Sequence, residues 1–148
     1  FYEILFFFFY YRTEEVLIIN QDGEKIQFPA PGKIEQLLSD LTDWYAKGQF
    51  DKNTHPLVNI SLFHFKFIST HPFLDGNGRV GRVLMFKECL KHNIIPFIIE
   101  DEYKGLYYRG LSEYVNERGY LRDTCLAMQD KYELLIKRFL GDLLDGNR

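Results

Sequence analysis

Cysteine is scarce in this sequence: Cys89 and Cys125 are the two that it contains. They are too few for a disulfide framework, and they form no spacing typical of a metal site. Each lies in a stretch with helical periodicity, so we expect both to be buried free thiols. Disulfide-rich domains belong to oxidising compartments. Two unpaired thiols instead predict a reducing, cytoplasmic location.

An excess of positive charge is also missing. The sequence has 18 Lys and Arg against 21 Asp and Glu, with a formal net charge of −3 and a pI near 5.8. Binding to nucleic acid or to an anionic membrane normally shows as a basic patch. We therefore expect neither as a partner, and any positively charged site has to be local.

Long hydrophobic runs are absent apart from residues 1–11, FYEILFFFFYY. This run is shorter than the roughly 20 residues that a membrane helix needs. It lacks the basic start and the small-residue cleavage site of a signal peptide. The sequence also opens on Phe rather than Met. We predict that residues 1–13 are an apolar core segment of a truncated N-terminus.

What is abundant is apolar and aromatic surface, at 46% and 17% of the residues. This composition predicts a packed core rather than a disordered chain. At this length we expect one domain, residues 1–148, that buries about 68–70% of its unfolded surface.

Residues 14–29 carry the pattern of a β-hairpin. The β-favouring run at 16–19 and the alternating run at 25–28 flank a turn at Gln21-Asp22-Gly23, and Pro29 follows. An exposed strand edge can pair with a segment of another protein. A structural hairpin that only covers the core is the alternative.

Helical spacing dominates residues 33–140, so the predicted fold is mainly α. One amphipathic helix is marked by Ile34, Leu37, Leu38, Leu41, Trp44 and Tyr45, and ends at Gly48. A second is marked by Leu57, Ile60, His64, Phe65 and Ile68, and a third by Val80, Val83, Phe86 and Leu90. Two more are expected over 101–115 and from about Leu121. His64, a lone histidine in an aromatic helix, is expected to be a core residue.

Residues 71–82, HPFLDGNGRVGR, are the most informative segment. One helical pattern ends near His71, and Gly76-Asn77-Gly78 turns the chain into the next helix. The start of a helix offers unpaired N–H groups and partial positive charge, and glycines let an anion approach the backbone. The turn is therefore predicted to bind phosphate.

Four side chains in this segment extend that prediction. Arg79 and Arg82 share one face of the helix start, where each cation costs roughly 0.3–1 kcal/mol unless a polyanion such as a triphosphate binds there. Asp75 offers the single carboxylate that Mg²⁺ commonly takes beside substrate phosphates and water. His71 remains as proton acceptor, because the pKa of imidazole lies near neutrality.

The segment resembles the signature of Fic domains, HPFx[D/E]GNGRxxR, with every specified position filled. The resemblance runs over about residues 11–140. It implies a helical bundle in which the hairpin is a flap over the active site. It also implies a protein adenylyltransferase, which transfers AMP from ATP to a Ser, Thr or Tyr hydroxyl of a target protein and releases pyrophosphate.

The resemblance assigns roles to individual residues. His71 deprotonates the target hydroxyl, Asp75 holds Mg²⁺, and Phe73 is a buried anchor. The nucleotide is expected to contact Gly76, Asn77, Gly78, Arg79 and Arg82, and, beside the adenine, Tyr107, Tyr108 and Asn116. Ordinary helix packing is the alternative for the two tyrosines. The target segment aligns along the flap at Leu17, Ile18 and Ile19.

Many members of this family carry an inhibitory helix with the pattern [S/T]xxxE[G/N], which is absent here. After Ser112 the glutamate position holds Asn116, and Glu117 comes one place late. The resemblance therefore implies inhibition by an N-terminal helix missing from this sequence or by a partner antitoxin. A homodimer and a role as toxin or effector are further expectations.

Three alternatives stay open. Gly76, Gly78 and Gly81 fit the dinucleotide fingerprint, but a strand should precede it and a proline-containing helix end does. A nucleotide-binding regulatory or interaction domain would lack the base or the metal ligand. Doc-like kinases typically carry Ala where this sequence has Gly76, which favours AMP transfer over phosphorylation, with other nucleotides or phosphocholine as further donors.

Overall fold

The computed structural model describes residues 10–19, 23, 25–48 and 54–145, with side chains up to residue 141. Most of the predicted apolar segment 1–13 lies outside the described residues, as does the greater part of the predicted turn at 21–23. Among the described residues, none of the helices combines the length and the apolar character that crossing a membrane requires.

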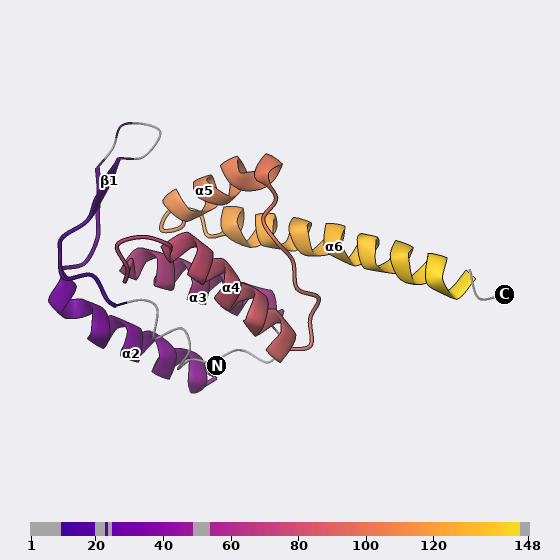
Figure 1. Cartoon of the computed structure of the whole chain (residues 1–148), viewed down its shortest axis with the longest axis horizontal. Helices are drawn as coiled ribbons and strands as arrows, with labels where there is room; N and C mark the ends of the chain where they lie inside the picture. Colours follow the sequence, from indigo (N-terminus) through magenta and orange to yellow (C-terminus); the bar gives the residue numbers. More distant parts are fainter. Residues whose placement is uncertain (1–9, 20–22, 24, 49–53, 146–148) are drawn as a thin grey trace. The chain divides into compact units, whose positions relative to one another are not determined.

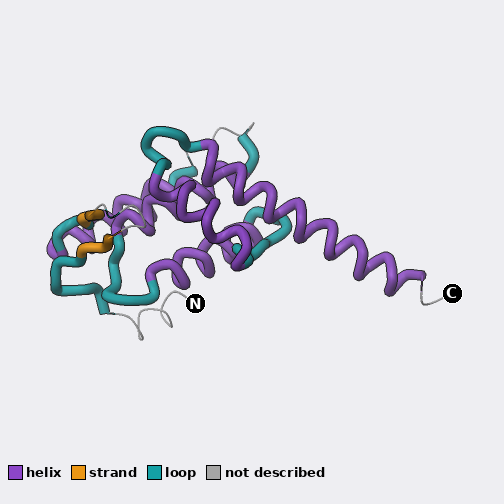
Figure 2. The backbone as a smooth tube through the Cα atoms, turned by 90° about the horizontal axis from the view of Figure 1, so that it is seen from above, coloured by secondary structure: helices purple, strands orange, loops and turns teal. Residues whose placement is uncertain are grey.

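The described chain is mainly helical, with one pair of short strands (Figures 1 and 2). The strands are β1 (Leu17–Ile19) and β2 (Lys25–Gln27). The helices are η1 (Pro31–Lys33), α2 (Ile34–Ala46), α3 (Pro56–Thr70), α4 (Asn77–Lys91), η2 (Asp101–Tyr103), α5 (Lys104–Ser112) and α6 (Gly119–Asp145). The predicted mainly α fold with a small hairpin is confirmed.

The hairpin pairs its strands antiparallel, with Leu17 opposite Gln27, Ile18 opposite Ile26 and Ile19 opposite Lys25. All six residues are exposed to solvent. Apolar side chains exposed on a short strand pair are suited to contact with another protein. The role of the hairpin as a flap stays a prediction.

Two compact units make up the chain. The first contains residues 1–51 and 63–82, and the second contains residues 52–62 and 83–148. Two compact units can belong to one domain or to two, so the prediction of one domain over residues 1–148 stays a prediction.

The core of the first unit joins α2 to the second half of α3. Ile34, Leu41 and Tyr45 are buried along one face of α2, and the Tyr45 ring lies 4.6 Å from that of Phe63. Helix α2 ends at Ala46, two residues before the predicted Gly48, whose φ of 57° is the left-handed conformation that glycine adopts without steric cost.

In the second unit α5 packs against α6, with Gly110 close to Leu121. Tyr107 of α5 and Leu121, Cys125 and Met128 of α6 are buried. Both cysteines are free and buried, as predicted. Burial raises the pKa of the Cys89 thiol to about 11 and that of Cys125 to about 12. Neither thiol is therefore reactive at neutral pH.

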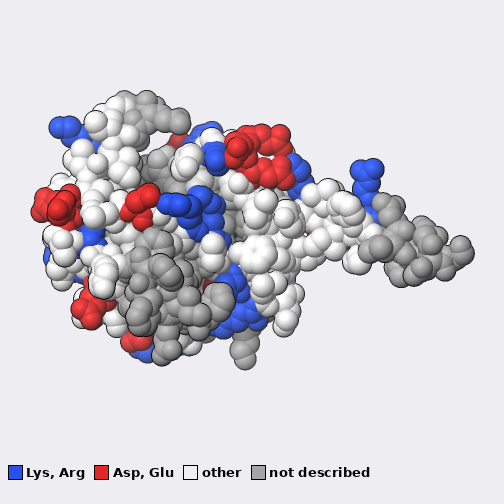
Figure 3. All heavy atoms as spheres, viewed as in Figure 1, with Lys and Arg blue, Asp and Glu red and all other residues white. Residues whose placement is uncertain are grey.

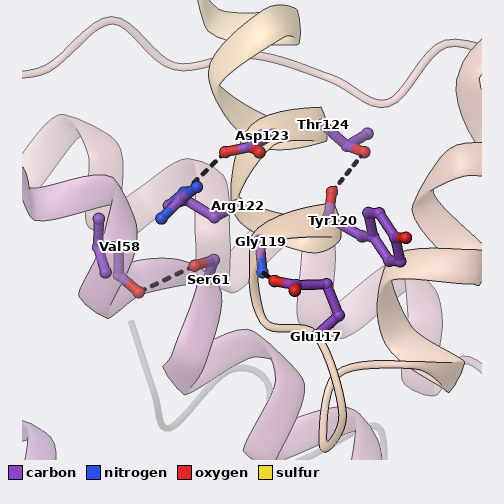
Figure 4. A network of polar contacts seen from close by, with 8 residues as sticks. All are labelled: Val58, Ser61, Glu117, Gly119, Tyr120, Arg122, Asp123 and Thr124. Atoms are coloured by element: carbon purple, nitrogen blue, oxygen red, sulfur yellow. Dashed lines mark hydrogen bonds and ion pairs between the residues drawn. The ribbon is translucent and has the colours of Figure 1, made fainter.

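Figure 4 shows how α6 begins in the second unit. The Gly119 N–H donates to Oε1 of Glu117 over 2.8 Å, and Thr124 Oγ1 donates to the Tyr120 carbonyl over 2.8 Å. Glu117 thus satisfies one of the N–H groups that the first turn of a helix leaves unpaired. This local role accounts for the glutamate next to the expected inhibitory position.

Of the predicted apolar face of α4 only Val80 is buried, and the rest of the prediction is wrong. Val83 and Leu90 are 52% and 55% exposed, whereas Leu84, Met85 and Cys89 are buried. The buried face also contains Gly81, which has no side chain, and Glu88, which is charged and forms an ion pair with Lys87. Apolar periodicity cannot identify a face that includes such residues.

Candidate active site

The motif forms a loop between α3 and α4 in the first unit. Helix α3 ends at Thr70 and α4 begins at Asn77, so His71 directly follows a helix and Gly76 directly precedes one, as predicted. Both take left-handed backbone conformations, with φ of 48° at His71 and 84° at Gly76. Such a φ is strained for a residue with a Cβ and is held by surrounding contacts.

The Asn77 side chain closes this loop. Its Oδ1 accepts the Phe73 N–H over 2.9 Å, and its Nδ2 donates to the Phe73 carbonyl over 2.7 Å. Asn77 is 4% exposed. Its side chain therefore holds the shape of the loop, and its contribution to a phosphate would come from the backbone N–H at the start of α4.

Phe73 is only half-buried, contrary to the expectation of a buried anchor. Its ring lies 6.2 Å from that of Tyr11 and 6.4 Å from that of Phe67. The fully buried residue of the loop is its neighbour Pro72. Proline suits this position because it brings no N–H that burial would leave unpaired.

Gly78 and Arg82 lie together at the start of α4. A Cβ placed on Gly78 would lie 3.1 Å from Nη1 of Arg82, so the guanidinium covers this glycine. The N–H groups of a helix start, a glycine surface and a cation therefore meet at one place. This arrangement suits the phosphates of a nucleotide.

Asp75 lies one residue before the turn, where its carboxylate pairs with Arg79 over 2.8 Å. The two side chains are 89% and 72% exposed. Within the described residues no three His, Cys, Asp or Glu side chains cluster in a way that could hold a metal ion. A lone exposed carboxylate fits Mg²⁺, which binds through one or two carboxylates when phosphates and water complete its shell.

The His71 imidazole stacks on the Phe28 ring at 4.0 Å between centroids and 25° between planes. Burial, and then the positive charge of Arg12, lower its pKa. Nδ1 is buried and finds no hydrogen-bond partner in the described part of the chain. The ring is therefore neutral at neutral pH, the state that a general base requires.

Arg12 and Phe28 are residues of this site that the sequence analysis missed. Arg12 is 2% exposed and donates from Nε to the His71 carbonyl over 2.7 Å. Its partner lies 59 positions away, so no local spacing could reveal the contact. Phe28 was recognised only as part of the hairpin.

His64 is a core residue, as predicted, with an exposed fraction of 0%. Its ring packs on Gly81, where an added Cβ would lie 2.9 Å from Cε1. This close approach lets the end of α3 lie against the first turns of α4. Burial lowers the pKa of His64 to about 4.

We expect the protein to lose stability as the pH falls from 6.5 towards 4. The unfolded chain binds a proton at His64 near the ordinary histidine pKa of 6.5, whereas the folded chain does so only near a pKa of about 4. The stabilisation is complete above pH 6.5, and its loss on acidification amounts to roughly 3 kcal/mol.

Denaturant unfolding at several pH values measures this loss. The pH dependence in this window should shrink in His64→Gln and persist in His55→Gln, since His55 is exposed. A slope that is the same in wild type and His64→Gln contradicts the assignment.

The remaining predicted residues stay predictions. In the second unit Tyr107 is 1% exposed and Tyr108 is 50% exposed, so only the Tyr108 ring is open to a ligand from solution. Asn116 is exposed in the turn after α5. In the hairpin Leu17, Ile18 and Ile19 are 50%, 40% and 63% exposed.

On the face drawn in Figure 3 acidic and basic side chains are interspersed.

Known proteins resemble this chain in sequence. The model of the Fic/DOC family matches residues 2–89. The protein adenylyltransferase Fic of Drosophila willistoni is 34% identical over 83 residues, which are 56% of this chain and 16% of that protein. The protein adenylyltransferase fic-1 of Caenorhabditis briggsae is 30% identical over 115 residues, 76% of this chain and 22% of that protein. The chain thus spans less than a quarter of the length of these relatives.

Solved structures share the fold. A Fic domain containing signaling protein from Bacteroides thetaiotaomicron has a TM-score of 0.75 at 22% identity, covering 89% of this chain and 55% of that one. A Fic family protein from Desulfovibrio desulfuricans has a TM-score of 0.66 at 26% identity, covering 87% and 41%. The match over residues 2–89 contains the loop with His71, Asp75 and Arg82, and the chain belongs to the Fic/DOC family.

Proposed function

We propose that this chain is a protein adenylyltransferase that transfers AMP from ATP to a Ser, Thr or Tyr hydroxyl of a target protein. One observation carries the proposal: a single loop holds a neutral, partly buried histidine next to a helix start covered by an arginine. The first feature provides a base and the second a phosphate site. The names of the relatives from Drosophila and Caenorhabditis support the same activity.

The proposed reaction is a displacement at the α-phosphorus of ATP. His71 takes the proton of the acceptor hydroxyl, the hydroxyl oxygen forms a bond to the α-phosphorus, and the bond to the β-phosphate oxygen breaks to release pyrophosphate. Gly76, Gly78, Arg79 and Arg82 hold the phosphates in place. Catalysis then comes mainly from positioning and from stabilisation of the charge on the phosphates.

Asp75 would hold Mg²⁺ in this reaction. The ion neutralises phosphate charge when it is bound with the nucleotide. In the structure Arg79 is the partner of the Asp75 carboxylate. A metal at Asp75 would take the place of this ion pair and would leave the Arg79 guanidinium available to a phosphate.

We expect Asp75→Ala to weaken the effect of Mg²⁺ on ATP binding, because a direct ligand of the ion is lost. The Mg²⁺ concentration required should rise by about tenfold. A titration of nucleotide binding against Mg²⁺ measures this change. Asp101→Ala is the matched control, since Asp101 is an equally exposed carboxylate that pairs with Lys104 in the second unit. An unchanged titration removes Asp75 from this role.

The target protein would dock by adding a strand to the hairpin. Leu17, Ile18 and Ile19 are exposed there, and main-chain pairing tolerates varied side chains on the partner. The proposal includes a cytoplasmic location, which buried free thiols support. It also includes inhibition by a further N-terminal helix or by an antitoxin, a toxin or effector role, and a homodimer.

Incubation of the purified chain with ATP, Mg²⁺ and cell lysate tests the proposal. Mass spectrometry should identify peptides that carry AMP on a Ser, Thr or Tyr, and the same peptides should be unmodified with His71→Ala. Phosphorylated peptides in their place would support transfer of the γ-phosphate instead.

A further inference from the structure

Arg12 is a buried cation of the first unit, and its contacts reach three separate segments. Nε donates to the His71 carbonyl over 2.7 Å, Nη1 donates to the Glu14 carbonyl over 2.8 Å, and Nη2 donates to the Pro29 carbonyl over 2.5 Å. The Arg12 backbone N–H donates to the Pro72 carbonyl over 2.9 Å.

These acceptors are the two ends of the hairpin and the catalytic loop. Glu14 opens the segment 14–29, and Pro29 closes it. His71 and Pro72 begin the motif. One planar guanidinium therefore holds the two ends of the flap at a fixed position relative to the backbone of His71, the proposed general base.

A buried guanidinium needs this many acceptors. Removing a charge from water is costly unless hydrogen bonds replace the lost hydration. Here backbone carbonyls on both sides of the forked guanidinium group accept such bonds. The geometry of the fork is rigid, whereas a lysine ammonium is a single point on a flexible stem. A lysine could keep the charge but could not bond to all three segments in the same geometry.

The bond to His71 acts on a strained residue. His71 has a φ of 48°, and the hydrogen bond to its carbonyl helps to hold this backbone conformation. A second contact comes from the flap itself, because the Phe28 ring stacks on the imidazole at 4.0 Å. Arg12 thus holds the histidine backbone while Phe28 holds the ring.

We propose that Arg12 is a positioning residue that fixes the orientation of His71 and links it to the two ends of the flap. The proposal rests on the proposed function in treating His71 as the base. A target segment that pairs with the hairpin would then be held at a fixed position relative to His71, because one guanidinium is bonded to both the flap and His71. The Arg12 guanidinium is buried and donates to backbone carbonyls, so its proposed role is positioning rather than catalysis.

The test compares Arg12→Gln, which removes the charge and the fork, with Arg12→Lys, which removes the fork alone. Arg138→Gln is the matched control, because Arg138 is an exposed arginine on α6. Proton NMR of the His71 ring reports on the positioning. Assays of AMP transfer, ATP binding and thermal unfolding accompany it.

In both Arg12 variants we expect the upfield ring-current shift from Phe28 to weaken. In Arg12→Gln the titration midpoint of His71 should also rise, because a positive charge has been removed. The kcat of transfer should fall by about 10–10²-fold through misplacement of the base. ATP affinity should stay within about threefold, because the residues that contact phosphate are unchanged.

A His71 ring signal in both variants that matches the wild type overturns the proposal, whatever the activity. If Arg12→Gln does not fold, the ring signal of Arg12→Lys decides the question in the same way. If the wild type transfers no AMP, the proposed function fails, and the NMR comparison still decides whether Arg12 positions His71.

Discussion

Replacement of His71 by Ala is expected to lower the rate of AMP transfer by about 10²–10⁴-fold, the usual contribution of a general base. The imidazole is neutral and partly buried, and His71 is the single histidine of the motif. ATP affinity should stay within about tenfold, or roughly 1.4 kcal/mol, since His71 is not among the residues proposed to bind the phosphates. Steady-state transfer and nucleotide titration measure the two effects separately.

His92→Ala provides the control, because it removes a histidine from the second unit and leaves the motif unchanged. It should transfer AMP at the wild-type rate. Normal turnover by His71→Ala would show that another group accepts the proton, and the assignment of the base would be withdrawn.

Gly110→Ala is expected to destabilise the fold by about 2–3 kcal/mol, a large effect for the addition of one methyl group. A Cβ on Gly110 would lie 2.7 Å from Cα and 2.8 Å from N of Leu121. These are backbone atoms of α6, so neither can move without shifting a helix. Thermal unfolding should show a midpoint lower by about 5–10 °C.

Gly105→Ala is the matched control on the same helix. Its Cβ would meet nothing within 4 Å, and alanine is favoured over glycine in helices. We expect this variant to be more stable than the wild type by about 0.5–1 kcal/mol. If Gly110→Ala were equally stable, the close packing of α5 on α6 would be wrong.

The features that the sequence predicted are those encoded by neighbouring residues. The hairpin follows from a β-branched run, a turn and an alternating run within residues 14–29. The loop from His71 to Arg82 follows from a helix end, a glycine turn and a helix start. His64 follows from its place in an aromatic helix. Each depends on contacts within a few positions, and the structure bears out each of them.

The features that were missed depend on contacts between distant segments. Arg12 meets His71 across 59 positions, and nothing in the sequence around either residue indicates the pairing. Phe28 meets the His71 ring in the same way. The buried face of α4 was misassigned because it includes Gly81, which has no apolar side chain to mark it. A glycine is needed there because His64 packs too closely to leave room for a Cβ, and this contact between helices cannot be read from the local pattern.

Asn77 shows a third kind of limit. The family resemblance predicts that it contacts the nucleotide, which stays a prediction, and the structure places it at the start of α4. The structure adds that both groups of its side chain are bonded to Phe73. A motif gives the residues of a site but not which of them shape the loop and which face the ligand.

Transfer of label from ATP tests the central claim most directly. The purified chain, with a protein acceptor or with itself as acceptor, is incubated with Mg²⁺ and ATP labelled at either the α- or the γ-phosphate. We expect stable label on protein from α-labelled ATP, none from γ-labelled ATP, and none from either with His71→Ala. Label from γ-labelled ATP alone, or α-label retained in His71→Ala, would contradict AMP transfer by this site.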